Sequence, residues 1–356
     1  MNSQSNAPAG ERIGLIDGAK GVGIFLVVLG HNTVFSLHLA DAKQAIYLFH
    51  MPLFFFLSGL TFKLGVPLKE MIYRRWRTLL VPYFAVALAS LLPGAILGGV
   101  GSVAVGMLGI LYGTGHTLRF TALWFLPCLF LACVVVHMLL GGSRKETAHT
   151  QSRFVLLFAA IAATAIGLLL VGSGRFSAWP FEDVMGRPLG APWSADLVPI
   201  AMGCLIAGMT LQRSDWLSRY AASAWLLPCA IAVLAALIYV GESVDLNYRR
   251  ISLPLLFPFG VLGGIAATLG VTGLLLRFPP LSRLARYVGT LSLIVLLFHM
   301  PIQRRIVDLL SAGSFLPASV AAAFGASLTI AVIAALDAWV IRPLPLSRWI
   351  FHPSGR

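Results

Sequence analysis

Long apolar runs separated by short polar segments make up most of the chain. Ten runs approach the length of about 20 residues that a helix needs to cross a bilayer. They lie at roughly 20–38, 45–62, 78–98, 122–140, 153–171, 196–211, 222–240, 253–276, 286–303 and 318–341. Lipid offers no partners for unpaired backbone groups, and the runs lack the alternation of a β-barrel. The pattern therefore predicts an all-α, polytopic membrane helix bundle with about ten transmembrane helices.

Basic residues are distributed unevenly between the segments that join these runs. If the N-terminus is cytoplasmic, most of the 26 Lys and Arg residues fall in cytoplasmic segments, as the positive-inside rule expects. This bias predicts that both termini are cytoplasmic. We expect an N-terminal tail over 1–19, a transmembrane domain over 20–342 and a C-terminal tail over 343–356.

The composition supports a membrane location. The chain is 58% hydrophobic and only 11% charged, whereas soluble domains carry about 25% charged residues. A net charge of +13 would suit a nucleic-acid partner, but the basic residues lie between apolar segments and no nucleic-acid motif is present. They indicate contact with anionic lipids instead. The four cysteines lack metal-ligand spacing, so no metal site is predicted.

The segment DGAKGVGIFLVVLGH, residues 17–31, carries ionisable groups into the first apolar run. Lys20 and His31 are eleven positions apart, which places them on one helix face about 16 Å apart. Asp17 lies close to the same line. A histidine within an apolar helix is costly to bury, so His31 is a functional candidate. A structural histidine bonded to a nearby carbonyl is the alternative.

The second run contains YLFHMPLFFFLSGL, residues 47–60. His50 poses the same question as His31, since it is a titratable group among apolar neighbours. Pro52 removes a backbone donor and can bend the helix. Ser58, next to a glycine, either permits close helix contact or contributes a hydroxyl.

Basic residues are densest between the second and third runs, where Arg74, Arg75 and Arg77 lie at the predicted cytoplasmic boundary. Guanidinium groups match the geometry of phosphate. A cytoplasmic loop is expected to be basic in any case, so charge alone does not distinguish a binding site from a topology signal.

Further candidates lie later in the chain. His116 precedes the segment LWFLPCLF on the predicted outer side and either contacts a glycan or is solvated. Trp124 either stacks on a sugar or anchors the membrane interface. His299 lies in a second copy of the tetrapeptide FHMP, which first occurs at 49–52.

Together these elements resemble the membrane acyltransferase 3 family. The resemblance rests on the Lys-x10-His element with its preceding Asp, the run FFFLSGL, RxxR followed by Pro-Tyr, LWFLPCLF at 123–130 and GTLSLIVLLFHMP at 289–301. The combination FHMPLFFFLSG is most similar to the fucose 4-O-acetylase-like branch. Many members carry a Ser-Tyr pair and an aromatic residue before the final histidine, where this chain has Leu291-Ser292-Leu293 and Phe298 before His299.

The resemblance implies transfer of an acyl group, usually acetyl, from cytoplasmic acetyl-CoA to a hydroxyl of a cell-envelope or secreted glycan. It implies catalytic roles for Lys20 and His31, to which we add Asp17 as a partner of Lys20. It also implies donor binding at Arg74, Arg75 and Arg77. Acceptor contacts are then expected from His50, Ser58, Trp124, His116 and His299, in a multi-pass protein of the bacterial inner membrane.

The residue types suit this chemistry. Transfer from a thioester to an alcohol needs a base for the hydroxyl proton, and neutral histidine is the usual one. A covalent acyl-histidine intermediate is equally open. The competing hypothesis is a secondary transporter of a sugar or lipid-linked glycan, since intramembrane histidines and broken helices occur there too. A basic RxxR at the cytoplasmic side favours the transferase.

Overall fold

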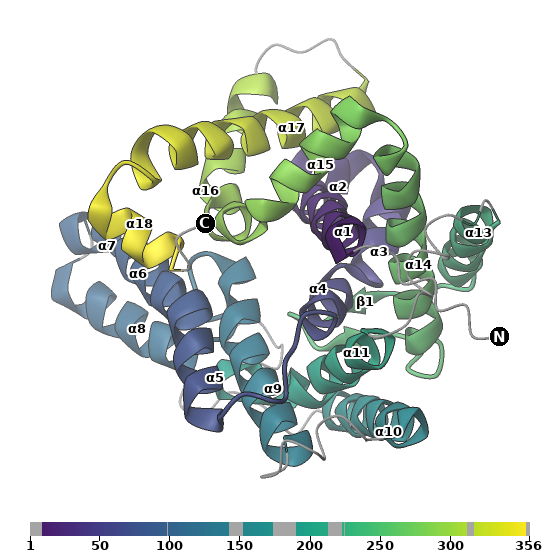
Figure 1. Ribbon diagram of the computed structural model, residues 1–356. Coiled ribbons are helices and arrows are strands. Elements are labelled where there is room, and N and C mark those ends of the chain that lie inside the picture. Colours follow the sequence, from purple (N-terminus) through teal and green to yellow (C-terminus); the bar gives the residue numbers. More distant parts are fainter. Residues whose placement is uncertain are drawn as a thin grey trace. The chain divides into compact units, whose positions relative to one another are not determined.

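The computed structural model describes residues 9–97, 99–141, 152–173, 190–212, 223, 225–311 and 317–353. Over these ranges the chain is helical apart from one two-stranded sheet (Figure 1). This confirms the predicted all-α class. The ends of the two predicted tails, 1–8 and 354–356, lie outside the described residues.

The elements follow one another with short connections. The first part of the chain forms α1 (Ala9–Gly30), α2 (Thr33–His38), α3 (Ala40–Tyr47), α4 (His50–Gly59), α5 (Leu68–Arg75), η1 (Trp76–Leu80), α6 (Val81–Ala89), α7 (Leu92–Leu97), α8 (Gly99–Tyr112), η2 (Thr121–Trp124) and α9 (Phe125–Leu140). The remainder forms α10 (Arg153–Gly172), η4 (Pro192–Leu197), α11 (Val198–Leu211), α13 (Leu226–Tyr239), β1 (Val244–Asp245), β2 (Arg250–Ile251), α14 (Phe257–Leu276), α15 (Pro279–Thr290), α16 (Ser292–Ser311), α17 (Ala318–Leu336), η5 (Asp337–Ile341) and α18 (Pro345–Phe351).

Seven helical segments in the described ranges are long and apolar enough to cross a membrane, or eight if the bent pair α15–α16 is one span. The seven are Ile13–Gly30, Leu68–Ile96, Thr121–Leu140, Arg153–Gly172, Pro192–Leu211, Phe257–Leu276 and Ala318–Ile341. The pair α15–α16 bends by 79°. The count of about ten and the side on which the termini lie stay predictions.

The segment predicted as a span over 45–62 is interrupted. Phe49 has a non-helical backbone (φ −142°, ψ −15°) between α3 and α4, so α4 has only 10 residues. The Phe49 ring packs directly over Gly264 of α14, in space that a side chain there would fill. The break makes His50 the first residue of α4. Pro52 lies in the first turn, where a helix needs no internal donor.

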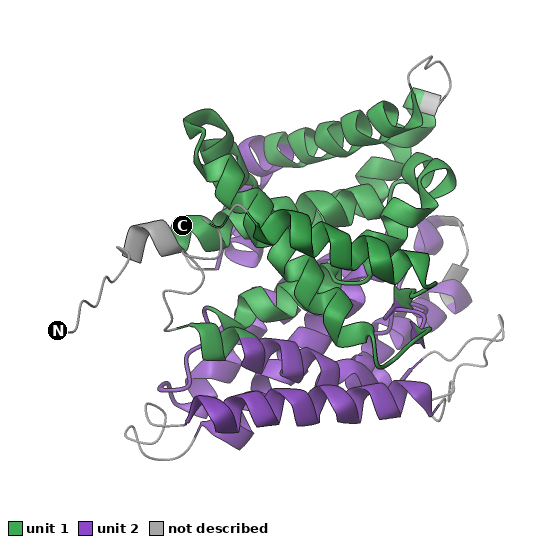
Figure 2. Cartoon of the chain, turned by 90° about the vertical axis from the view of Figure 1, so that its right-hand side faces the viewer, with its two compact units in different colours: residues 1–60, 208–244, 251–335 green, residues 61–207, 245–250, 336–356 purple. Residues whose placement is uncertain are grey.

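The chain divides into two compact units, which are described separately below. Unit 1 comprises residues 1–60, 208–244 and 251–335, and unit 2 comprises residues 61–207, 245–250 and 336–356 (Figure 2). The family-like motifs divide between them, since His31, His50 and His299 belong to unit 1 and the RxxR segment belongs to unit 2.

Unit 1 is built around α1, which packs against α4, α14, α15 and α16. The contact with α15 is the most intimate because both helices carry glycine there. A side chain at Gly21 would meet the Ala285 carbonyl, and one at Gly289 would meet the Asp17 carbonyl. Backbones approach this closely in membrane proteins where small residues remove the intervening side chains. The contact holds the Asp17–Gly21 stretch of α1 against α15.

Unit 2 is built around α9, which packs against α5, η1, η2 and η4. The helix is buried along much of its length, with Cys128, Ala132 and Cys133 all fully covered. The C-terminal helix α18 packs on α6 and η5 within the same unit. This packing places part of the predicted tail beside the segment that carries Arg77.

Candidate functional site

Three histidines from different parts of the chain lie together in unit 1. His31 follows the end of α1, His50 begins α4 and His299 lies in α16. The ring centroids of His31 and His299 are 5.1 Å apart, and those of His31 and His50 are 6.4 Å apart. His50 and His299 are buried, whereas His31 is partly exposed. His31 is therefore the central and most accessible member of the cluster.

The same hydrogen bond fixes the tautomer of each ring. In all three, Nδ1 lies at hydrogen-bond distance from the carbonyl four residues earlier. The acceptors are Val27 at 2.9 Å, Ile46 at 3.1 Å and Val295 at 3.0 Å. A carbonyl only accepts, so Nδ1 carries the hydrogen and Nε2 of the neutral ring carries a lone pair. The cluster thus presents three candidate bases.

Nε2 of His299 has no hydrogen-bond partner among the described residues, although the side chain is fully buried. An unpaired buried acceptor is costly and uncommon in native structures. Such an atom is available to a hydroxyl or an amide of a bound molecule. The arrangement supports a contact between His299 and a polar ligand near His31.

Tyr47 is a neighbour of this cluster that the sequence analysis did not select. Its ring centroid lies 4.7 Å from that of His50 and 6.1 Å from that of His31. Tyr47 also packs against the apolar cluster of Phe35, Ile46 and Ala322. Its position three residues before His50 was the available signal.

Gln303 is a second residue that the sequence did not reveal. Its side-chain amide donates a 2.7 Å hydrogen bond to the carbonyl of Val28, and Gln303 is buried. Val28 lies in the last turn of α1, where carbonyls lack intrahelical donors. Gln303 is also one turn from His299 on α16. The amide therefore joins α16 to the end of α1 immediately before His31.

Asp17 and Lys20 form an ion pair with a distance of 3.2 Å between Nζ and Oδ1. The two side chains are 30% and 26% exposed for Lys20 and Asp17 respectively. Both lie on α1, about 16 Å before His31 along the helix. Lys20 thus contacts Asp17, at a distance from the three rings.

Ser58 lies two turns beyond His50 on α4. Its hydroxyl donates a 2.8 Å hydrogen bond to the carbonyl of Phe54 in the preceding turn. This is a common way for serine to satisfy its hydroxyl in a helix. A role for Ser58 in substrate binding stays a prediction.

The three predicted donor-binding arginines lie in unit 2, on α5 and η1. Arg74 pairs with Glu70 one turn earlier and is exposed. The guanidinium of Arg75 lies over the ring of Phe62, 5.5 Å from its centroid. Arg74 and Arg75 therefore each have one local partner at the surface of the unit.

Arg77 has a different environment. Its guanidinium lies 3.7 Å from the ring centroid of Trp349, on the C-terminal helix α18. One of its terminal nitrogens also donates a 3.0 Å hydrogen bond to the Trp349 carbonyl. The sequence assigned Trp349 to a tail and gave no sign of this contact.

Trp124 and His116 also belong to unit 2. Trp124 is 3% exposed and packs edge-on against Phe125, with ring centroids 6.5 Å apart. His116 packs edge-on against Tyr248 at 4.8 Å. Their roles in sugar binding stay predictions.

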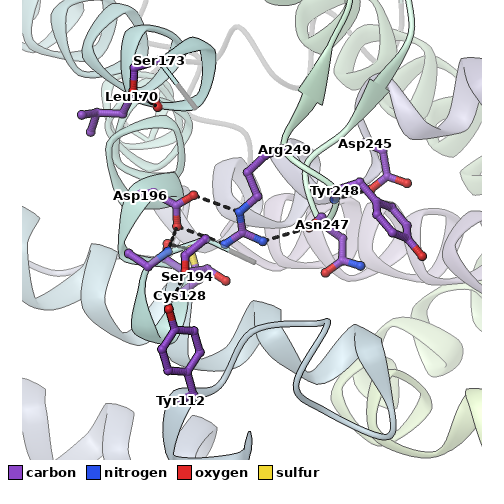
Figure 3. A network of polar contacts seen from close by, with 12 residues as sticks. Tyr112, Cys128, Leu170, Ser173, Ser194, Asp196, Asp245, Asn247, Tyr248 and Arg249 are labelled. Carbon is purple, nitrogen blue, oxygen red and sulfur yellow. Dashed lines mark hydrogen bonds and ion pairs between the residues drawn. The ribbon is translucent and has the colours of Figure 1, made fainter. Parts of the chain in front are cut away.

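A buried ion pair organises the loops of unit 2. Arg249 donates from Nε and Nη2 to the two carboxylate oxygens of Asp196 at 2.9 and 3.0 Å (Figure 3). The side chains are 3% and 1% exposed. The Ala191 amide also donates to Asp196, and a third guanidinium nitrogen donates to the Asn247 carbonyl. The pair closes residues 190–197 onto residues 245–250.

Backbone strain accompanies this network. Trp193, Ser194 and Arg249 all have positive φ, between 51° and 57°. This conformation disfavours residues other than glycine, and it persists only where surrounding contacts enforce it. The Asp196–Arg249 pair and the Trp193 hydrogen bond to the Leu111 carbonyl are contacts of that kind.

Glu242 is a further buried carboxyl, in unit 1. Its Oε2 accepts from the Leu253 amide at 2.7 Å, and its backbone carbonyl accepts from the Gln44 side chain. Burial raises the pKa of the Glu242 carboxyl above its ordinary value, and the Leu253 amide opposes part of that rise.

Metal chemistry receives no support from the described residues. No group of three or more His, Cys, Asp or Glu side chains in these ranges has the arrangement of a metal site. The three clustered histidines therefore act, if at all, through their own nitrogens.

Comparison with known proteins identifies the family. A family model described as an acyltransferase domain matches residues 13–336, which extend from α1 to the end of α17. No match was found among curated proteins or solved structures. The matched region contains the histidine cluster and the arginines of α5 and η1. The chain therefore belongs to this acyltransferase family, and its apolar helices make it a multi-pass membrane acyltransferase.

Proposed function

We propose that the protein transfers an acetyl or related acyl group from cytoplasmic acyl-CoA to a hydroxyl of a cell-envelope or secreted glycan in the bacterial inner membrane. The observation that carries this proposal is the cluster of His31, His50 and His299, with each Nδ1 bonded to a carbonyl. Neutral imidazoles held in one tautomer are suited to take a proton from an alcohol. The similarity of FHMPLFFFLSG to the fucose 4-O-acetylase-like branch supports a sugar acceptor.

In the direct reaction, Nε2 of His31 takes the acceptor hydroxyl proton while the oxygen attacks the thioester carbonyl. The new C–O bond forms, the C–S bond breaks, and the proton passes to the departing CoA thiolate. In the relay alternative, Nε2 first displaces the thiolate and holds the acyl group. His299 or His50, with rings 5.1 and 6.4 Å from His31, would then take the acceptor proton. Both routes place His31 at the reacting carbonyl.

The basic test uses the full-length protein in nanodiscs with acyl-labelled acetyl-CoA and a panel of glycans. We expect free CoA thiol to form in equal amount with a base-labile ester on the glycan. Glycan export without CoA release would instead support a transporter. Consumption of acetyl-CoA with no acceptor ester would contradict the proposed acceptor class.

The arginines provide a test of the donor site. We expect Arg74→Ala combined with Arg77→Ala to raise the KM for acetyl-CoA by about tenfold, because charged hydrogen bonds to phosphate are lost. The initial rate as a function of acetyl-CoA concentration measures the effect. Lys69→Ala is the matched control, since it removes one exposed positive charge from the same helix. Equal KM values for the double variant and the control would exclude this donor site.

Gln303 provides a test of how His31 is held. We expect Gln303→Leu to lower kcat about tenfold with little change in the KM for acetyl-CoA, because the Val28 carbonyl loses its donor beside His31. Gln44→Leu is the control, since Gln44 also donates to a backbone carbonyl in unit 1, at Glu242. If the two variants have the same kcat, Gln303 has only a structural role. Circular dichroism and thermal unfolding verify that both variants fold.

A further inference from the structure

The contact between Arg77 and Trp349 has features that a structural contact alone does not require. The guanidinium lies flat enough over the indole to approach its centroid to 3.7 Å, and it also bonds the Trp349 carbonyl at 3.0 Å. Two contacts from one residue fix both the position and the direction of the remaining N–H groups. The pair lies wholly within unit 2.

The charge of Arg77 is not balanced by a carboxylate within the described residues. Neighbouring cations are balanced there, because Arg74 pairs with Glu70 and Arg342 pairs with Asp337. Nη1 of Arg77 is moreover buried and lacks any hydrogen-bond partner in that part of the chain. A buried, unpaired donor on a cation is costly unless an anion binds it. The geometry favours an anionic ligand with acceptor oxygens, such as a phosphate.

Trp349 offers a second surface to the same ligand. One face of the indole is covered by Arg77, yet the residue is 55% exposed. An exposed aromatic face is a platform for a planar base, and a stacked arginine adds a cation–π contribution. A molecule that joins an aromatic base to phosphate would use both groups at once.

The C-terminal helix that presents Trp349 is held from both ends. Asp337 is fully buried and accepts from Arg342 Nε at 2.7 Å and from His352 Nε2 at 2.6 Å. Arg342 precedes α18, and His352 follows it. The ring is therefore placed before any ligand arrives, which lowers the entropic cost of binding.

We propose that Arg77 and Trp349 together bind the adenosine phosphate part of the acyl donor, with Trp349 stacking on the base and Arg77 holding a phosphate. This inference rests on the proposed use of acyl-CoA and adds α18, which lies beyond the matched residues 13–336, to the donor site. Phosphate also occurs in lipid headgroups, but a headgroup carries no aromatic base to stack on the exposed face of Trp349.

The test measures binding of adenosine 3′,5′-bisphosphate, the nucleotide part of coenzyme A, to the full-length protein in phosphatidylcholine nanodiscs. This probe cannot be acylated, so binding is read without any reaction. We expect it to quench tryptophan fluorescence in the wild type, and Trp349→Phe to lose most of that quench. By calorimetry, Trp349→Ala should raise the Kd about tenfold and Trp349→Phe should restore much of the affinity, because phenylalanine still stacks. Trp339→Ala removes an 80% exposed tryptophan of the same unit and is the matched control.

The outcomes separate this proposal from the proposed function. Bisphosphate binding that depends on Trp349, without acyl transfer, would support the site and refute the reaction. Acyl transfer with an unchanged KM for acetyl-CoA in Trp349→Ala would overturn the site and leave the reaction intact. The site is also overturned if wild type fails to bind the bisphosphate. Equal competition by inorganic phosphate, or by phosphatidylglycerol in the nanodisc, would overturn it too, because it would indicate recognition of phosphate alone.

Discussion

Replacing His31 by alanine is expected to abolish acyl transfer while the protein still inserts and folds. Removal of a general base costs about 10²–10⁴-fold in rate, and removal of a covalent carrier costs at least as much. His31 is the member of the cluster that contacts both other histidine rings. Transfer of label from acetyl-CoA to glycan measures the loss.

His38→Ala is the matched control for this experiment. His38 also bonds its Nδ1 to the carbonyl four residues earlier, at 3.0 Å, but it is exposed on α2. The two variants therefore remove the same ring and the same local hydrogen bond. Wild-type activity in His31→Ala, with thermal unfolding unchanged, would exclude His31 from the chemistry. His50→Ala and His299→Ala should show intermediate losses, since each ring neighbours His31.

Breaking the Asp196–Arg249 pair is expected to give the largest loss of stability. Arg249→Met leaves the Asp196 carboxylate buried with no cation, and removal of one partner from such a pair costs about 3–5 kcal/mol in the free energy of unfolding. The bidentate geometry and the near-complete burial place this pair among the strong cases. Denaturant or thermal unfolding in detergent measures the change.

Arg250→Met provides the control, because Arg250 is the exposed neighbour with the same charge. We expect the Arg250 variant to lie within about 0.5 kcal/mol of wild type, as surface substitutions usually do. Replacing both partners, with Asp196→Leu added to Arg249→Met, should recover part of the loss because no uncompensated charge remains. If Arg249→Met unfolds like Arg250→Met, the pair contributes nothing to unit 2.

The helical class was predictable because apolar runs of this length leave few alternatives in lipid. The interruption at Phe49 was not, since it depends on the fit of that ring over Gly264, more than 200 residues away in the chain. Hydropathy is a local average, and it does not report which side chain fills a space on another helix. The span at 45–62 was therefore read as continuous.

The candidate site shows the same division. His31, His50 and His299 were each selected from local sequence, but their meeting depends on how α16 packs on α1. Gln303 carried no local signal, because its role comes from a carbonyl at the end of a distant helix. Trp349 was hidden for another reason, since a short polar C-terminal segment resembles a tail until its helix is seen against η5 and α6.

The backbone contact of α1 with α15 limits which sequences can encode this protein. At Gly21 and Gly289 an added methyl group would collide with a carbonyl of the opposite helix rather than with a side chain. A collision with a side chain can be relieved by trimming the partner, whereas a carbonyl belongs to every amino acid. No second substitution can therefore compensate at either position. A directed-evolution library gains nothing from randomising these two codons, and its diversity is better spent around the histidine cluster.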